Sequence, residues 1–209
     1  MGGFLPPAGG YRKLRTYRLA EIIYDLTMIF ADKLVRRGSR TRDQVEQAAR
    51  SGKQNIAEGS EASRTSKETE IKLTNVAKAS LEELLLDYED YLRQHNLPQW
   101  DKMHPRTVRL REYLKSDDFD RCPMRYAGRL NEEEYCNLCI TLINQATYLL
   151  KRLLDKQQQQ FLEYGGIKEQ MYRARMAYRS QTRPTRPTRP TGLTGLTGLT
   201  GPTNSDGKN

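Results

Sequence analysis

The sequence predicts an all-α protein: an antiparallel four-helix bundle with an insertion between helices 3 and 4 and a disordered C-terminal tail. Two observations lead to this fold class. Apolar residues recur at intervals of three and four positions along four long stretches, as they do on one face of a helix. Clusters rich in glycine, serine, threonine or proline separate these stretches and mark helix ends. We expect the bundle over residues 11–165 and the insertion over residues 96–129.

Composition predicts further segments on either side of the bundle. The 209 residues carry a formal net charge of +9, 36% hydrophobic residues and a mean hydropathy of −0.82. Residues 182–209 hold few large apolar side chains and repeat Thr-Arg-Pro and then Gly-Leu-Thr, which predicts a disordered low-complexity tail. Residues 1–10 are rich in glycine and proline and predict a flexible lead-in, and residues 166–181 predict a short basic helix.

The first predicted helix begins at Tyr11 and ends near Arg36–Arg40, with Gly38 as a left-handed cap. Its apolar stripe consists of Leu19, Ile22, Ile23, Leu26, Ile29, Phe30 and Leu34. Four basic side chains lie at its start: Arg12, Lys13, Arg15 and Arg18. Because a helix N-terminus favours acids, this placement carries a small electrostatic cost. Two interpretations stay open, a solvated basic end and an anion-binding surface.

The second predicted helix is capped by Thr41 and carries a narrow face of small residues. This face comprises Val45, Ala48, Ala49, Gly52, Ile56 and Ala57. Small residues let helices approach closely, so we expect the face to lie within the bundle or at a subunit contact. The helix ends in the segment Ser51–Gly59, and a hinge follows over residues 60–64. Thr65–Glu68 then has the spacing of a capping box for the third helix.

Asn55 and Glu58 form a polar pair, one helical turn apart, in the segment that ends the second helix. Their apolar neighbours predict that both are at least partly buried, and buried polar groups need hydrogen-bond partners. We therefore expect them to join the end of the second helix to the first helix or to the hinge, in preference to forming a ligand site.

The third predicted helix, residues 66–93, has an acidic face opposite its apolar seam. The acids are Glu82, Glu83, Asp87, Glu89 and Asp90. They suit a solvated face or a basic helix of a neighbouring subunit. In the insertion, we expect Trp100, the only tryptophan, to anchor the loop on the bundle rather than to stack on a nucleobase.

Asn131–Glu134 predicts a capping box at the start of the fourth helix, which Gly165-Gly166 should end. The segment Ile167–Tyr178 then mixes basic and aromatic residues. Such a mixture suits contact with nucleic acid, and it equally suits an amphipathic helix that docks on a partner.

No constellation of residues predicts catalysis, a cofactor or a bound metal. Cys136 and Cys139 have the spacing of zinc or redox ligands, but only Cys122 and His104 could complete a zinc site. We expect these cysteines to be buried and free, because such thiols pack as small apolar side chains. Neither His104 nor His95 lies near a credible nucleophile, so we expect no enzyme. Without a signal pattern or a long apolar run, we expect a cytoplasmic protein with no membrane contact.

Three segments carry a resemblance to a known family: Gln54–Gly59, Ser66–Glu68 and Asn75–Leu84. They resemble the bacterial four-helix-bundle proteins, which include proteins encoded in 23S rRNA intervening sequences and the accessory variability determinants of diversity-generating retroelements. The resemblance extends over Tyr11–Asp155, and the loop Leu97–Trp100 is similar to that of a subgroup with a suffix domain. The motif residues that it identifies are Asn55, Glu58, Gly59, Ser66, Lys67 and Glu68. It implies a homo-oligomer, usually a pentamer, and a reverse transcriptase as a partner.

Charge and resemblance together predict a non-enzymatic, oligomeric accessory protein that binds RNA or DNA backbone without base readout. The predicted binding surface consists of Arg12, Lys13, Arg15, Arg18, Arg36, Arg37, Arg40, Arg42, Arg50 and Lys53. The alternative is a protein-interaction or scaffold module whose helices bind a partner protein, in which case the positive charge serves solubility alone.

Overall fold

The computed structural model describes residues 10–125 and 127–182. Over these residues every regular element is a helix and no strand occurs, which confirms the all-α class. The predicted lead-in (residues 1–10) and the predicted tail (residues 182–209) lie outside the described residues, apart from Gly10 and Thr182. The described part of the last helix reaches Thr182, one residue into the segment predicted to be disordered.

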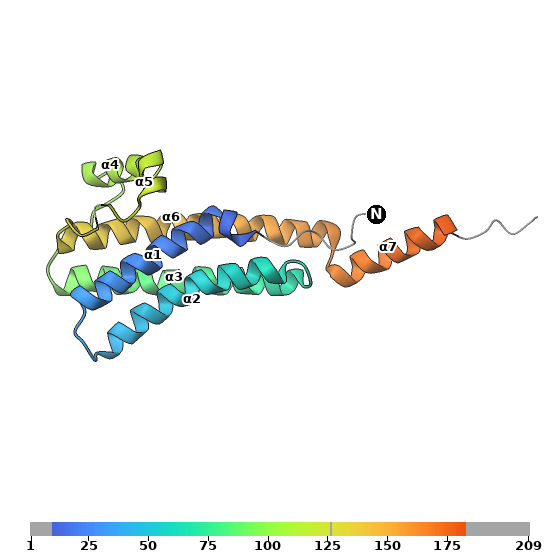
Figure 1. Ribbon diagram of the computed structural model, residues 1–209, viewed down its shortest axis with the longest axis horizontal. Coiled ribbons are helices and arrows are strands. Elements are labelled where there is room, and N and C mark those ends of the chain that lie inside the picture. The colour runs from blue at the N-terminus through green and yellow to red at the C-terminus, as the bar shows by residue number, and fades with distance from the viewer. Residues whose placement is uncertain (1–9, 126, 183–209) are drawn as a thin grey trace, which may run out of the picture.

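Four long helices form the body of the molecule (Figure 1). They are α1 (Arg15–Lys33), α2 (Arg40–Ala62), α3 (Lys67–Gln94) and α6 (Glu132–Tyr164). α2 packs against α1 and α3, and α6 packs against the same two helices, so each long helix has two long neighbours. The chain reverses direction at residues 34–39 and again at residues 63–66 (Figure 1).

Shorter helices flank this body. The 3-10 helix η1 (Tyr11–Lys13) precedes α1. The insertion forms α4 (Pro105–Tyr113), which packs on α6, and the short α5 (Asp117–Arg121). α7 (Ile167–Thr182) follows α6 and leads away from the body (Figure 1).

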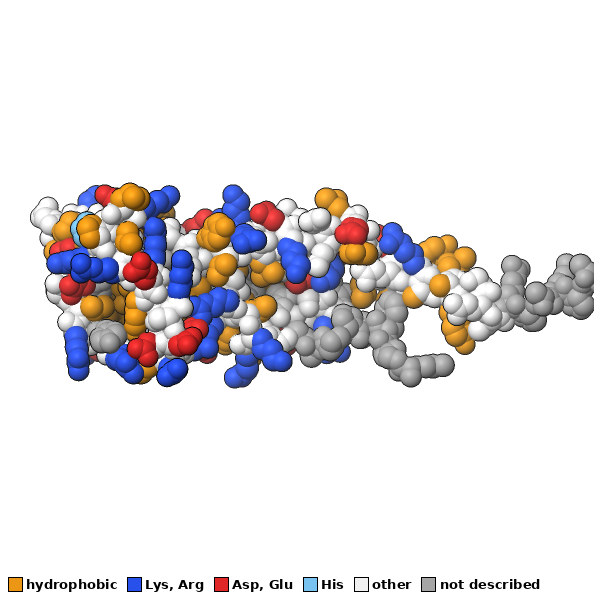
Figure 2. Space-filling model, turned by 90° about the horizontal axis from the view of Figure 1, so that it is seen from above, with side chains coloured by type: hydrophobic (Ala, Val, Ile, Leu, Met, Phe, Trp, Pro, Cys, Tyr) orange, Lys and Arg blue, Asp and Glu red, His pale blue; other side chains and the backbone are white. Residues whose placement is uncertain are grey.

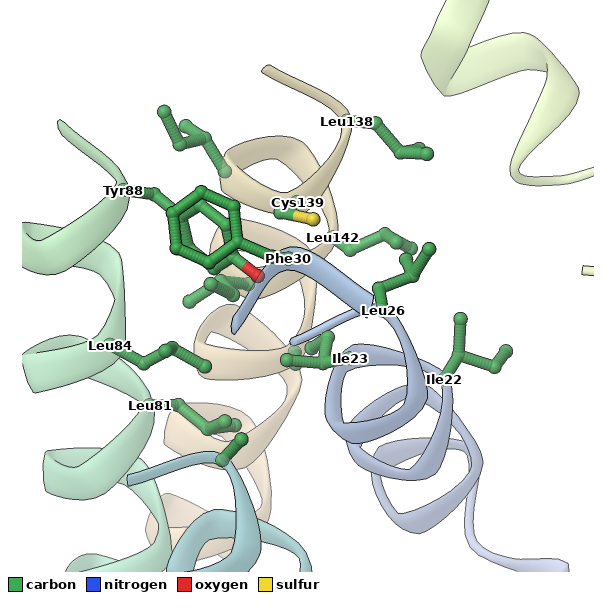
Figure 3. Close-up of a cluster of buried hydrophobic side chains, with 14 of the residues drawn as sticks. Ile22, Ile23, Leu26, Phe30, Leu81, Leu84, Tyr88, Leu138, Cys139 and Leu142 are labelled. Atoms are coloured by element: carbon green, nitrogen blue, oxygen red, sulfur yellow. The ribbon is translucent and has the colours of Figure 1, made fainter. Parts of the chain in front are cut away.

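The apolar stripes of α1, α3 and α6 meet in a common core (Figure 3). Fully buried side chains from the three helices include Ile23, Leu26, Phe30, Leu81, Leu84, Tyr88 and Leu142. Burial of each such side chain favours the folded state by about 1.5–3 kcal/mol. The phenols in this core are hydrogen-bonded, since Tyr88 Oη lies 3.0 Å from Thr27 Oγ1 and Tyr135 Oη donates to the Leu26 carbonyl at 2.7 Å. In the predicted stripe of α1, five residues are buried and Ile29 and Leu34 are half-buried, so the periodicity identifies the core face of this helix.

Small residues bring α2 close to α3. On the predicted narrow face, Ala57 is half-buried and the other five residues are buried. A Cβ atom at Gly52 would lie 2.6 Å from Leu81 Cδ2, and one at Gly59 would lie 3.3 Å from Leu73 Cβ. Only glycine fits the first of these positions without a shift of the neighbouring side chain. The face is thus buried within one chain.

Several predicted helix ends are wrong. α2 continues through Ser51–Gly59 to Ala62, because its glycines face α3 and gain packing there that offsets their low helix propensity. Ser66, not Thr65, caps α3: its hydroxyl accepts from the Thr69 amide at 3.1 Å, while Thr65 Oγ1 donates back to the Ala62 carbonyl. The Thr65–Glu68 capping box is therefore not formed.

At the other end of α2, Ser39 rather than Thr41 is the cap, and its hydroxyl accepts from the Arg42 amide at 3.3 Å. α1 already ends at Lys33, before the predicted boundary, although Gly38 does have the expected positive φ of +75°. Two other predicted ends are confirmed. Asn131 and Glu134 form a reciprocal capping box, and Gly165 ends α6 with φ +72°.

Candidate nucleic-acid interface

The ten basic residues of the predicted surface do not form one patch. One group lies at the start of α1, a second lies in the turn between α1 and α2, and Arg50 and Lys53 lie midway along α2. The first two groups are separated by the length of α1, about 28 Å at 1.5 Å per residue. On the face that Figure 2 shows, basic and acidic side chains are intermixed.

Two arginines of the first group hold the insertion in place. Arg15 forms an ion pair with Asp120 of α5 and donates to the Leu114 carbonyl at 3.1 Å. Arg18 donates to the backbone carbonyl of Asp120. The hydrogen bond from Arg15 lowers the pKa of the Asp120 carboxyl. Arg15 and Arg18 therefore have partners in the insertion, whereas Arg12 and Lys13 are exposed and form no ion pair with an acid among the described residues.

The turn between α1 and α2 carries the most concentrated exposed charge among the predicted residues. Five basic and two acidic side chains lie between Asp32 and Asp43. We call Arg36, Arg37 and Arg40 the turn cluster; all three are exposed. Arg37 has a side chain 83% exposed and only a 3.5 Å contact with Asp32. In the described part of the chain no ion pair joins Arg36 or Arg40 to an acid.

Arg42 differs from the turn cluster because it is half-buried and paired. Its Nε donates to Glu46 Oε1 at 3.0 Å, and its Nη2 lies 3.5 Å from Asp32 Oδ1. Farther along α2, Lys53 Nζ lies 3.9 Å from the centre of the Tyr24 ring, a cation–π contact between α2 and α1. Arg50 is exposed.

The motif residues lie at the junction of α2 and α3. Asn55 is half-buried and donates within its own helix to the Ser51 carbonyl at 2.9 Å and to Ser51 Oγ, which lies 2.9 Å from Ser80 Oγ of α3. Glu58 is exposed and accepts from Gln54 of the same helix at 3.2 Å. The expected hydrogen bonds to α1 or to the hinge are therefore absent among the described residues. Asn55 instead donates to Ser51, whose hydroxyl contacts Ser80 of α3.

The other motif residues begin α3. Ser66 is its cap, and Gly59 lets the two helices approach each other. Lys67 pairs with Glu70 at 2.7 Å, and Glu70 in turn accepts from Gln157 of α6 at 3.0 Å. The pKa of the Glu68 carboxyl is lowered by backbone and Ser66 hydrogen bonds. Gly59 and Ser66 thus have packing and capping roles, and Glu58 and Glu68 are exposed. Sequence reasoning missed Gln157, because a buried glutamine inside a polar run has no periodic signal.

Trp100 anchors the insertion on α6, as the sequence predicts. Its backbone amide donates to Asn137 Oδ1 at 2.8 Å, and its indole Nε1 donates to Glu133 Oε1 at 2.7 Å. The ring stacks on His104 with 5.2 Å between centroids. The indole is therefore held by polar contacts at its edge and by a ring on its face.

Two of the three cysteines are thiols of the apolar core. Cys136 and Cys139 are buried and free, and Cys122 is exposed. Burial raises the pKa of Cys139 to about 12 and raises that of Cys136 as well, so both are neutral thiols at physiological pH. Among the described residues no group of three or more His, Cys, Asp or Glu side chains is arranged to hold a metal ion.

In residues 10–125 and 127–182, no helix is both long enough and apolar enough to cross a membrane. A scan against protein-family models and searches of curated proteins and of solved structures find no match to this chain. The surface geometry is what supports a function for it.

Proposed function

We propose that this chain is a non-enzymatic accessory protein that binds the backbone of RNA or DNA without base specificity. The observation that carries the proposal is the turn cluster: three exposed arginines in a turn where basic side chains outnumber acidic ones. Guanidinium groups of this kind suit phosphate oxygens, and contacts to phosphate alone carry no sequence information. Arg50, Lys53, Arg12 and Lys13 lie apart from the turn cluster and add weaker, separate contacts.

The proposal includes a fold, an assembly and a partner. We infer that α1, α2, α3 and α6 constitute an antiparallel four-helix bundle, which the contacts between neighbouring long helices and the short connections at residues 34–39 and 63–66 support. The homo-oligomer, usually a pentamer, and the reverse transcriptase as a partner are supported by the family resemblance alone, and a cytoplasmic location stays a prediction from the sequence.

The test is binding of the full chain to a generic RNA and a generic DNA duplex across a salt series, from about 50 to about 200 mM. One variant reverses the turn cluster: Arg36→Glu, Arg37→Glu and Arg40→Glu. A matched control reverses three exposed arginines of the insertion, Arg109→Glu, Arg121→Glu and Arg129→Glu, so that both variants have the same net charge.

For three phosphate contacts, we expect the slope of log affinity against log salt to become less steep by about 2–3 in the turn-cluster variant. In the control variant the slope should stay close to that of the unchanged protein. An equal loss in the two variants would show that only net charge matters, and the turn would then not be a site. Absence of binding by the unchanged protein at low salt would overturn the proposal.

A second candidate function is a protein-interaction module. The observation that favours it is α7, on which Met171, Tyr172, Met176 and Tyr178 are each between 47% and 66% exposed. If partner binding is the function, the unchanged protein should show no salt-dependent binding to either nucleic acid.

A further inference from the structure

α7 is a helix without a packing partner in the described part of the chain. None of its residues is buried, and every residue from Met171 to Thr182 is exposed. Isolated helices of about 12–15 residues are marginal in water, and most helices in proteins are stabilised by packing of an apolar face. With 16 residues, α7 exceeds this length only slightly. We therefore expect a surface that packs against α7 to stabilise it as a helix.

Side chains of two kinds are arranged in stripes along α7. At 3.6 residues per turn, Ile167, Met171, Ala174 and Tyr178 share one stripe. A basic stripe of Lys168, Arg175 and Arg179 lies next to it, and Tyr172 and Met176 lie on the far side of the basic stripe. Hydrophobic side chains are visible where α7 leaves the body (Figure 2). The resulting α7 face is positive in the middle and apolar at both edges.

The outward face of α3 has the complementary character. Leu86 is 62% exposed, and the exposed acids Glu82, Glu83 and Asp90 surround it on the helix surface. Two of these acids have a local basic partner, since Glu82 pairs with Lys78 and Asp90 pairs with Arg93. Burial, and after it the charges of Glu83 and Asp90, raises the pKa of the neighbouring Asp87 to about 6. We call Leu86 and its three surrounding acids the acidic face.

We propose that the basic, apolar-edged face of α7 docks on the acidic face of a second copy of this chain. The two faces match in charge, and each carries exposed apolar side chains that the contact would bury. An intermolecular contact is favoured because α7 begins beside Glu68: a Cβ atom at Gly166 would lie 2.7 Å from its Oε1. From there α7 leads away from the body, whereas Leu86 lies 18 residues farther along α3, about 27 Å from Glu68.

Such a contact joins two different surfaces, so it is head-to-tail. Contacts of this type generate closed rings when the rotation closes and open chains when it does not. The inference specifies the interface of the homo-oligomer included in the proposed function. It is independent of nucleic-acid binding, because neither face contains a residue of the turn cluster.

The test measures the mass of the full chain by light scattering and sedimentation over a range of concentrations. One variant reverses the α7 face (Arg175→Glu and Arg179→Glu), and another reverses the acidic face (Glu83→Lys and Asp90→Lys). A control reverses two exposed cations of α6 (Lys151→Glu and Arg152→Glu) and so matches the charge change of the first variant. We expect the unchanged protein and the control to associate, and each face variant to associate at least about tenfold more weakly.

Mixing the two face variants is the decisive step. The reversed α7 of one variant then meets the reversed acidic face of the other, so association should be restored in the mixture. If neither variant weakens the oligomer, this interface is wrong, although the homo-oligomer itself stands. If the mixture of the two variants stays dissociated, this interface is also wrong. If the chain is a monomer at all concentrations and the amides of α7 are protected from exchange, α7 folds back on its own chain. A second copy is then not the partner of α7, and the proposal is overturned.

Discussion

At the scale of single residues, Gly52 sets the distance between α2 and α3. The Cβ of an alanine there would lie 2.6 Å from Cδ2 of Leu81. The Leu81 side chain is fully buried, so it has no solvent-filled space into which it could shift. Overpacking costs about 1–3 kcal/mol, and the better helix propensity of alanine offsets about 1 kcal/mol of this. We therefore expect Gly52→Ala to lower the free energy of unfolding by about 1 kcal/mol in urea titrations.

A double-mutant cycle with Leu81→Ala serves as the control for this clash. Leu81→Ala alone opens a cavity and should destabilise the chain by about 2–5 kcal/mol. In that background the added methyl group of Gly52→Ala fills space instead of clashing, so it should be neutral or stabilising. If Gly52→Ala costs the same in both backgrounds, contact with Leu81 is not the cause.

Asp87 makes the stability of the fold depend on pH. Burial, with the charges of Glu83 and Asp90, raises its pKa in the folded chain to about 6, above the ordinary value of 3.8. The folded state thus binds this proton more tightly than the unfolded state does. The corresponding stabilisation is complete below about pH 4 and is lost as the pH rises through about 6.

We accordingly expect Asp87→Asn to raise the Tm above pH 7 and to leave it unchanged below about pH 4. Thermal unfolding followed by circular dichroism at a series of pH values measures this difference. Asp155→Asn, which removes an exposed carboxylate from α6, is the control and should shift the Tm little at any pH. A Tm difference that is constant with pH would contradict the raised pKa.

At the scale of elements, one carboxylate links the insertion to α1. Asp120 accepts from Arg15 by its side chain and from Arg18 by its backbone. We expect Asp120→Asn to speed hydrogen exchange in α4 and α5 about fivefold, which corresponds to about 1 kcal/mol for a partly exposed ion pair. Exchange in α6 should not change. Asp117→Asn, an exposed residue of the same short helix, is the matched control, and equal effects of the two changes would argue against this link.

Elements also show where prediction from sequence succeeds and where it stops. The stripe from Leu19 to Phe30 and the capping box at Asn131 are local patterns, and local patterns suffice to place a core face or a helix start. Thr65 and Ser66 offer adjacent hydroxyls, so sequence cannot tell which one caps α3. The predicted end of α2 failed because packing on α3 carries the helix through its glycines.

Sequence could not show that two residues of the predicted binding surface, Arg15 and Arg18, have partners in the insertion. Arg15 and Asp120 are 105 positions apart, and only the fold brings them together. The sequence around a basic side chain at a helix start does not indicate whether an acid far along the chain forms an ion pair with it. Arg36, Arg37 and Arg40 could be identified from sequence because a short turn between two helices is exposed by its geometry.

At the scale of the whole molecule, the proposed surfaces are spread along the long axis. The turn cluster lies at one end of the body and α7 leaves from the other (Figure 1). Nucleic-acid binding and assembly can therefore be lost separately. We expect the turn-cluster variant to keep the mass of the unchanged protein, and the α7 variant to keep its salt slope per chain for nucleic acid. A loss of both properties in either variant would show that the two surfaces depend on each other.

The place of Trp100 has an optical consequence. This is the only indole in the chain, and it lies where the insertion meets α6, with its ring tilted only 13° from that of His104. Its fluorescence therefore reports on that junction without any label. Release of the insertion would expose the ring to water and shift its emission to longer wavelength. In a urea titration, an emission change that precedes the loss of ellipticity would show that the insertion detaches while the long helices are still folded.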